Sequence, residues 1–281
     1  MRAQLSLTVP EGKQLIARAI AALPEVQRAL AHGRILLKGG TTVSALAEEL
    51  VGVPLRISGR ISPRGSKSAW ADDPAPHSIL IEGGNWRSVD EDFGAVVAGM
   101  GRDDVAVLGA NAIDVHGNAA MMAGRALGGV PGQALAGLMA QGVQVIIACG
   151  LEKLIPGSIA EAVASAGMAA CDWSLGMAVG LMPLCGRLVT EREALEILAG
   201  VRCAVIGRGG IDGAEGGTTL VCEGASDRVK KAIDAVLAVK GSRTSGSELS
   251  RRECRAGHRR CREHRPCVWR MWGKKGWGMW E

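Results

Sequence analysis

The sequence lacks any long hydrophobic run, and this absence excludes a membrane-spanning helix. Crossing a bilayer takes about 20 consecutive apolar residues, whereas the longest candidate, residues 174–189, is interrupted by Pro183 and several glycines. The first residues, MRAQLSLTVPEGK, also lack an apolar core of signal-peptide length. We therefore expect an unexported, cytoplasmic protein that does not bind membranes.

Aromatic residues are scarce, and they are unevenly placed. The chain has no Tyr and one Phe, and four of its seven Trp follow Val268. Arg outnumbers Lys by 24 to 9, as expected of a very GC-rich gene. Out-of-frame translation of such DNA tends to give a mixture of Arg, Gly, Cys and Trp like the one near the end of this chain. We expect residues 241–281 to be a linker and a basic tail that is disordered or non-native.

The positive charge of the chain is confined to that tail. Residues 251–281 hold ten Lys and Arg against three Glu, a net of +7, so the chain total of +5 leaves about −2 for residues 1–250. A near-neutral globular part gives no reason to expect a specific nucleic-acid partner. The tail Cys and His residues fit none of the usual zinc-finger spacings, so no metal site is expected. The other cysteines, which lie in apolar segments, are expected to be buried thiols: Cys149, Cys171, Cys185, Cys203 and Cys222.

Short apolar strands alternate with helical patterns in the first part of the chain. The strands are expected at residues 35–38, 53–58, 77–84, 105–109 and 143–150. Uniformly apolar strands separated by helices are typical of a mainly parallel sheet covered on both faces. We expect an α/β domain over residues 1–167, with a Rossmann-like sheet.

The pattern changes after residue 167. Strands are expected at 177–182, 202–207 and 218–224, and helices at 190–198 and 226–239. This β-α-β-β-α order resembles a large part of a ferredoxin-like unit. We expect a small α+β subdomain over residues 168–240.

The sharpest motif is KGGTT at residues 38–42, where a strand runs through glycines into a helix. Free backbone N–H groups, the positive end of the helix dipole and two hydroxyls meet there, as at a phosphate or carboxylate site. The motif is not a P-loop, because no GKS or GKT follows at the required spacing. The alternative is a glycine turn in which Thr41 only caps its helix. The candidate anion-binding residues are Lys38, Gly39, Gly40, Thr41 and Thr42.

A second candidate follows the predicted strand at 105–109. Open α/β sheets bind ligands beyond the carboxyl ends of their strands, where Asn111, Asp114 and Asn118 could bind sugar hydroxyls. His116 could move protons near neutral pH. A solvated loop is the alternative interpretation.

Two charged residues follow other predicted strands. Lys153 comes after the strand at 143–150, and it could reach an anion bound at the glycine turn. Glu82 ends the strand at 77–84, and a carboxylate beside glycines can be a nucleophile in acyl transfer. Either side chain could instead lie on an ordinary surface.

In this order the segments resemble the ligand-sensing domain of DeoR-type sugar regulators. More broadly they resemble the superfamily of ribose-5-phosphate isomerase, glucosamine-6-phosphate deaminase and CoA transferases. The resemblance covers residues 12–155 and is carried by ILLKGGTTVSALAEEL, by the segment from ILIEGGNWR to VLGANAID, and by VIIACGLEKL. It implies a phosphate held by the residues 39–42, a hydroxyl bound by Asp114 and an anionic group bound by Lys153.

The chain also departs from that family. Asn111 stands where the family usually has Asp, and an amide cannot be a general base, which weakens an isomerase assignment. Lys38 replaces a residue that is often acidic in the regulators. The N-terminal part is too short for their DNA-binding winged helix, so we do not expect a repressor.

These observations favour a protein that binds an anionic, phosphorylated small metabolite of the sugar-phosphate or CoA-ester class. One alternative is an enzyme of the same superfamily, either an acyl-CoA transferase acting through Glu82 or an isomerase with Asp114 or His116 as its base. Another is a non-catalytic sensor or scaffold. We expect no cofactor, and we expect the protein to form a homo-oligomer.

Overall fold

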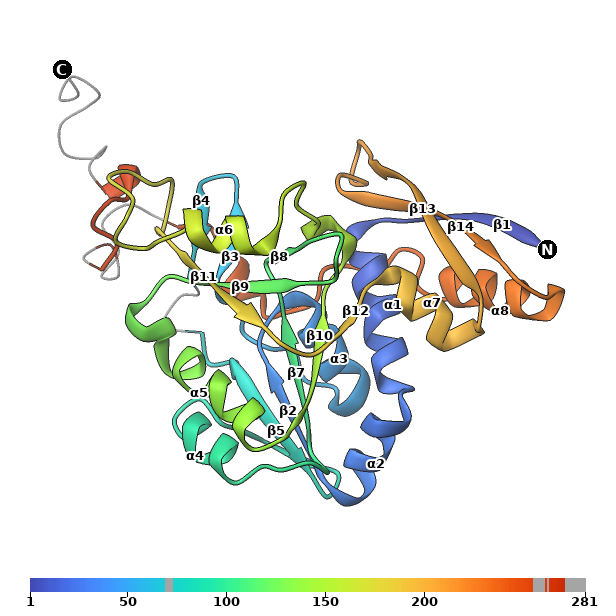
Figure 1. Cartoon of the computed structure of the whole chain (residues 1–281), viewed down its shortest axis with the longest axis horizontal. Coiled ribbons are helices and arrows are strands. Elements are labelled where there is room, and N and C mark those ends of the chain that lie inside the picture. The colour runs from blue at the N-terminus through green and yellow to red at the C-terminus, as the bar shows by residue number, and fades with distance from the viewer. Residues whose placement is uncertain (69–72, 255–260, 262, 271–281) are drawn as a thin grey trace.

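A mixed sheet of six strands lies at the centre of the computed structural model (Figure 1). Its order is β12–β10–β7–β2–β5–β6, formed by Arg187–Val189, Gln144–Ala148, Val105–Gly109, Arg34–Lys38, Ser78–Glu82 and Asn85–Ser88. The strands from β12 to β2 are parallel, whereas β5 and β6 are antiparallel. The structure describes residues 1–68, 73–254, 261 and 263–270. The predicted α/β class with parallel strands is confirmed, while β5 runs opposite to β2.

Helices cover both faces of this sheet. One face carries α1 (Val9–Ala21), α2 (Pro24–His32) and α3 (Thr41–Val51), and the other carries α4 (Phe93–Ala98) and α5 (Gly129–Ala140). Successive side chains of a strand point to opposite faces. In β2, therefore, Leu37 packs in the core with α1 and α3, while Leu36 packs in the core with α4. This two-sided burial explains why β2 reads as an uninterrupted apolar run.

A second sheet pairs the first strand of the chain with two strands from its later part. It has the order β1–β14–β13, formed by Arg2–Leu7, Gly217–Glu223 and Arg202–Gly209, and it is antiparallel. The helices α7 (Glu191–Ala199) and α8 (Ser226–Leu237) pack with it, and their buried residues share one core cluster with α1 and β2. The strand predicted at 177–182 is not part of this sheet, because its place is taken by β1 from the start of the chain.

That predicted strand belongs to a third sheet of order β11–β9–β8, formed by Gly180–Leu184, Ala119–Ala123 and Ala112–Ile113. Three short helices flank it, namely η1 (Ala126–Gly128), η2 (Leu151–Lys153) and α6 (Ile159–Ser165). In Figure 1 this small sheet lies beyond the upper ends of β7 and β10. It therefore covers the edge at which those parallel strands end.

The strand predicted at 53–58 is not formed. The segment makes isolated backbone hydrogen bonds instead, from Arg56 N–H to the Pro76 carbonyl (2.8 Å) and from Ser247 N–H to the Leu55 carbonyl (2.9 Å). It leads into a hairpin of β3 (Arg60–Ser62) and β4 (Gly65–Lys67). Of its two buried residues, Leu55 joins the core cluster that contains α1 and α3, and Ile57 lies against Gly246 of the C-terminal segment.

The described part of residues 241–270, which belongs to the stretch predicted to be a linker and a disordered or non-native tail, packs onto this hairpin region. It includes the short helix α9 (Glu248–Arg251). Ser62 Oγ donates to the Glu253 carboxylate (2.9 Å), and Trp269 Nε1 donates to the Arg64 carbonyl (2.8 Å). The predicted tail residues 255–260, 262 and 271–281 lie outside the described residues.

The expectation of five buried thiols is wrong for four cysteines. Cys203 and Cys222 form a disulfide between the paired strands β13 and β14. Cys171 and Cys185 are exposed, because they lie in connections rather than in strands, whereas Cys149 is a buried thiol as predicted.

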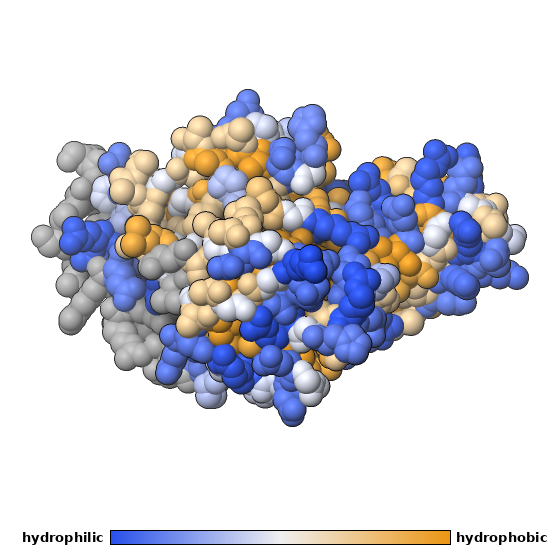
Figure 2. All heavy atoms as spheres, turned by 60° about the horizontal axis from the view of Figure 1, so that its bottom comes forward, coloured by the Kyte–Doolittle hydropathy of each residue, from blue (hydrophilic) through white to orange (hydrophobic). Residues whose placement is uncertain are grey.

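In the described part of the chain, no helix is both long enough and apolar enough to cross a bilayer. Figure 2 brings the lower side of Figure 1 forward, where hydrophilic and hydrophobic residues are intermixed.

The pairing of β1 gives a test of the fold. A variant lacking residues 1–7 should lose protection of the amides of residues 217–223 in hydrogen exchange, because Leu7 and Leu220 are buried in the same core and β14 would become an edge strand. The control is Gln4→Thr, which changes an exposed side chain and keeps the backbone pairing. Unchanged protection in the truncated chain would contradict the pairing.

Candidate functional site

The parallel strands bring three chain segments to one edge of the sheet. Register aligns Leu37 of β2 with Val107 of β7, and Gly109 of β7 with Ala148 of β10. The residues that follow these strand ends line a cavity of about 90 Å³, formed by residues 38–42, 109–111 and 148–150 with Glu152 and Lys153. The structure thus brings together four sequence-predicted elements, namely Lys38, the glycine turn, Asn111 and Lys153.

The first turn of α3 opens toward this cavity. Its N-cap, Gly40, makes no side-chain capping bond, and the first intrahelical bond runs from Ser44 N–H to the Gly40 carbonyl (2.7 Å). The N–H groups of Thr41 and Thr42 precede that bond, so the helix does not satisfy them. A Cβ at Gly40 would meet nothing within 4 Å, which shows open space there.

Gly39 differs from its predicted role. Its N–H donates to the His77 carbonyl (2.7 Å), and it is therefore committed to the contact between β2 and β5. A Cβ at this position would lie 2.4 Å from the His77 carbonyl oxygen and 2.8 Å from that of Arg56. Glycine is needed at position 39 for close backbone approach, not for binding an anion through its amide.

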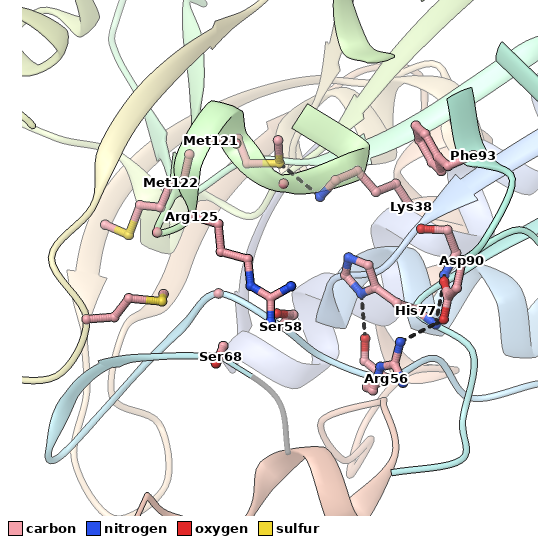
Figure 3. Close-up of a pocket in the computed structure, with 17 residues that line it drawn as sticks. Lys38, Arg56, Ser58, Ser68, His77, Asp90, Phe93, Met121, Met122 and Arg125 are labelled. Carbon is pink, nitrogen blue, oxygen red and sulfur yellow. Dashed lines mark hydrogen bonds and ion pairs between the residues drawn. The ribbon is translucent and has the colours of Figure 1, made fainter. Parts of the chain in front are cut away.

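A larger cavity of about 250 Å³ lies next to the first (Figure 3). Residues from three parts of the chain line both cavities: Lys38, Ser58, Gly59, Met121 and Met122. The remaining polar lining of the larger cavity comes from Arg56, Ser68, His77, Ser78, Asp90 and Arg125. The two cavities together form one hollow at the carboxyl edge of the sheet.

Lys38 stands between the two cavities. It is the last residue of β2, and it is 8% exposed. Its Nζ lies 3.0 Å from Met121 Sδ, a weak acceptor, and no carboxylate of the described residues forms an ion pair with it. Burial lowers the pKa of Lys38 to about 8. An ammonium group is thus held beside the cavity without a counter-charge from the protein.

A second buried polar group lies across from it. Ser78 of β5 is the register partner of Lys38, it is fully buried, and it lines the larger cavity. Its Oγ has no hydrogen-bond partner in the structure. Directly paired residues project to the same face of a sheet, so two incompletely satisfied polar side chains face this cavity from neighbouring strands.

The floor of the larger cavity is a fixed hydrogen-bond network. Asp90 accepts from Arg56 Nη2 (2.7 Å) and from the N–H groups of His77 and Ser78 (2.9 and 2.8 Å). His77 Nδ1 lies 3.0 Å from the Arg56 carbonyl, which can only accept, so Nδ1 carries the proton. Burial, with Lys38 adding to it, lowers the pKa of His77 to about 4. The ring is neutral, and the Arg56–Asp90 pair adds no net charge.

Two further cations complete the wall. Arg125 follows β9 and extends its guanidinium toward Ser58 in Figure 3. Lys153 ends η2 and lines the smaller cavity. Neither makes an ion pair with a described residue. The acid beside Lys153, Glu152, is already paired with Lys13 at 3.2 Å, so the hollow carries a net positive charge.

A buried carboxyl holds η2 in place behind the site. Glu191 is 2% exposed, and its Oε2 accepts from Leu151 N–H at 2.8 Å. Burial is the main cause that raises the pKa of Glu191 to about 7, and the charge of Glu152 adds to it. Glu191 therefore positions the turn that carries Lys153 but does not line either cavity.

The predicted Asp114–Asn118 turn is outside the hollow. Asp114 is 4% exposed and accepts four hydrogen bonds, from the N–H groups of His116, Asn118 and Ile159 and from Asn118 Nδ2. These bonds, with Asn118 Nδ2 first, lower the pKa of Asp114 to about 2. Asp114 thus organises the turn and the start of α6, while His116 and Asn118 are exposed. Asn111 does line the cavity, but its amide bonds Gly59 and Met122.

Glu82 lies at the opposite end of the sheet. It pairs in register with Arg34, the first residue of β2, whereas Lys38 is the last. The prediction assumed a parallel strand, and the reversed direction of β5 moves its carboxyl end away from the other strand ends. The same reversal brings His77 and Ser78, at the start of β5, to the site.

Sequence reasoning missed most of the larger cavity. The sequence pattern places Arg56 and Ser58 in a predicted strand, and it gives no role to Asp90 or Arg125. A signal was present for His77 and Ser78, two polar residues directly before an apolar run. Their significance depends on strand direction, which the pattern does not give.

Lys38→Met should stabilise the unliganded protein. The folded-state pKa of about 8 lies below the ordinary 10.5, so the cost of charging Lys38 is fully present below pH 8 and disappears as the pH rises toward 10.5. We expect the variant to gain about 3 kcal/mol in free energy of unfolding at pH 7, with a smaller gain at pH 10. Urea unfolding at both pH values measures this. A gain that is equal at both would contradict the assignment to charge burial.

Asp114→Ala should destabilise the fold, since four donors lose their acceptor. The folded-state pKa of about 2 lies below the ordinary 3.8, so this stabilisation is present above pH 4 and is lost as the pH falls toward 2. Thermal melts should show a lower melting temperature at pH 7 and a smaller deficit at pH 3. His116→Ala is the control and should melt like the wild type. An unchanged melting temperature for Asp114→Ala would contradict the structural role of Asp114.

No group of three or more His, Cys, Asp or Glu side chains among the described residues is arranged to hold a metal ion. Of the tail residues considered for zinc, His258 lies outside the described part. Comparison of the chain with protein-family models, with curated proteins and with solved structures finds no match.

Proposed function

We propose that the protein binds a small phosphorylated metabolite of sugar-phosphate size in the hollow at the carboxyl edge of the sheet. One observation carries the proposal: three cations without carboxylate partners, Lys38, Arg125 and Lys153, surround cavities that also receive the uncapped first turn of α3. Fixed positive charge and free N–H groups together are what a phosphate dianion requires.

The dimensions support a small ligand. The cavities have volumes of about 250 and 90 Å³, and pockets for drug-sized ligands span about 300–1,000 Å³. A phosphorylated sugar of a few carbons fits this space better than a whole CoA ester. The phosphate would occupy the smaller cavity beside Thr41 and Lys153, and the carbon chain would extend past Lys38 into the larger one.

The enzymatic alternatives lose support from the placement of their residues. An acyl-CoA transferase acting through Glu82 has its nucleophile at the wrong end of the sheet. An isomerase with Asp114 as base has that carboxylate committed to four hydrogen bonds. We keep the relationship to the sugar-phosphate isomerase superfamily, and the Rossmann-like sheet that it implies, as a proposal. The homo-oligomer and the cytoplasmic location stay predictions.

Calorimetry with glycerol 3-phosphate tests the proposal. Binding should weaken about tenfold or more in Lys153→Ala, which loses a charge-assisted contact with the phosphate worth about 1.5–3 kcal/mol. It should also weaken in Arg125→Ala, which loses a charge-assisted hydrogen bond to a hydroxyl of the carbon chain in the larger cavity. Binding should also weaken as salt is raised.

Arg102→Ala is the matched control, since it removes an exposed cation beside the opposite end of the sheet. Glycerol, which lacks the phosphate, should not bind. No binding of glycerol 3-phosphate, or equal losses in all three variants, would overturn the proposal.

A further inference from the structure

Lys38 is poorly suited to be only an anion-binding group. Arg125 and Lys153 are partly or fully exposed, so they can meet a phosphate at little cost in desolvation. Lys38 instead is buried at 8% exposure, and its nearest polar partner is the thioether of Met121. Burial without a carboxylate favours the uncharged amine, which is a nucleophile.

We propose that the Lys38 amine forms an imine with the carbonyl carbon of a phosphorylated aldehyde or ketone. This inference rests on the proposed function and narrows its substrate class, because the ligand must carry a carbonyl group as well as a phosphate. The lowered pKa of Lys38, about 8, means that a useful fraction of the amine is neutral at physiological pH.

The placement of the two functions fits one ligand. Lys38 precedes the glycine turn, and it lines both the cavity at the α3 N-terminus and the larger cavity. A phosphate held beside Thr41 would leave the adjoining carbons of the ligand near Lys38. Binding through the phosphate thus supplies the orientation that a bimolecular condensation otherwise lacks.

Ser78 supplies the matching polar group. Its Oγ is buried, unpartnered and directly across the strand pair from Lys38. A hydroxyl in that position can donate to the oxygen of the carbonyl group that is attacked, and it can accept a proton in return. The only buried hydroxyl oxygen without a partner among the described residues therefore faces the proposed nucleophile.

The chemistry balances without a further reactant. The Nζ lone pair forms the C–N bond while the carbonyl π bond breaks, and one amine proton moves to the oxygen, giving a carbinolamine. The C–O bond then breaks, the oxygen leaves as water with a second proton from nitrogen, and the C=N bond forms. The sum is amine plus carbonyl giving imine plus water.

Borohydride trapping on the full chain tests the inference. Dihydroxyacetone phosphate is the carbonyl probe, and reduction of its imine would leave a stable secondary amine that peptide mass mapping locates. At pH 7 a lysine of pKa about 8 has roughly a hundredfold larger neutral fraction than an exposed lysine. We expect label on Lys38 at least about tenfold above that on any other lysine, and protection by glycerol 3-phosphate, which has no carbonyl.

Lys67 is the matched internal control. It is also buried, and burial lowers its pKa too, but it lines neither cavity. Label on Lys67 equal to that on Lys38 would mean that burial alone directs the reaction, and would overturn the inference. Lys38→Met should abolish the adduct and keep the fold, as its melting curve would show. Ser78→Ala should slow trapping while glycerol 3-phosphate still binds.

The outcomes separate the two proposals. Glycerol 3-phosphate binding without a preferred adduct on Lys38 would overturn the imine and leave phosphate binding in place. Equal labelling of Lys38 by dihydroxyacetone and by its phosphate, with no binding of glycerol 3-phosphate, would overturn phosphate recognition instead and with it the phosphorylated substrate class.

Discussion

The parallel alignment of β2, β7 and β10 is the constraint on which the site depends. Because the three strands share a direction, their carboxyl ends meet at one edge of the sheet, and the segments that leave them must turn there. Such turns expose backbone N–H groups that no strand partner uses, as at the first turn of α3. The small sheet β8–β9–β11 closes over this edge and converts it from an open rim into a lined hollow.

The reversed strand β5 changes the chemistry of that hollow. A fourth parallel strand would deliver its carboxyl end, with Glu82, to the site. The antiparallel strand delivers its beginning, where His77 and Ser78 precede the apolar run. Asp90 then fixes these two residues through their N–H groups, and it is itself neutralised by Arg56. A neutral wall thus faces Lys38, and the positive charge of the hollow remains uncompensated by the protein.

The reversed direction of β5 also explains why the sequence predicted only part of the site. Apolar runs and glycine turns located β2, β7 and β10, and hence the meeting of Lys38, Thr42 and Lys153, because these follow from local pattern plus parallel pairing. The direction of β5 and the pairing of β1 with β14 depend on contacts between distant segments, to which hydrophobic periodicity is blind. Asp114 had the right residue type in the right kind of loop, but its four donors come from the turn itself and from α6. Polar residues after a strand therefore indicated a candidate edge, and only the three-dimensional packing distinguished lining residues from turn-forming ones.

The lining of the hollow argues that it is a site and not a packing defect. Cavities that stay empty in proteins are lined by apolar side chains, since unsatisfied polar groups are costly when buried. Here the buried Lys38 and Ser78 both lack a full partner, and both belong to central strands that could have carried apolar residues without harm to the core. A ligand that satisfies them would add its binding free energy to the stability of the fold. Unsatisfied buried groups also lie elsewhere, at Lys67 Nζ and Asp73 Oδ2 for example, but Lys38 and Ser78 lower the stability of the unliganded fold at the hollow itself.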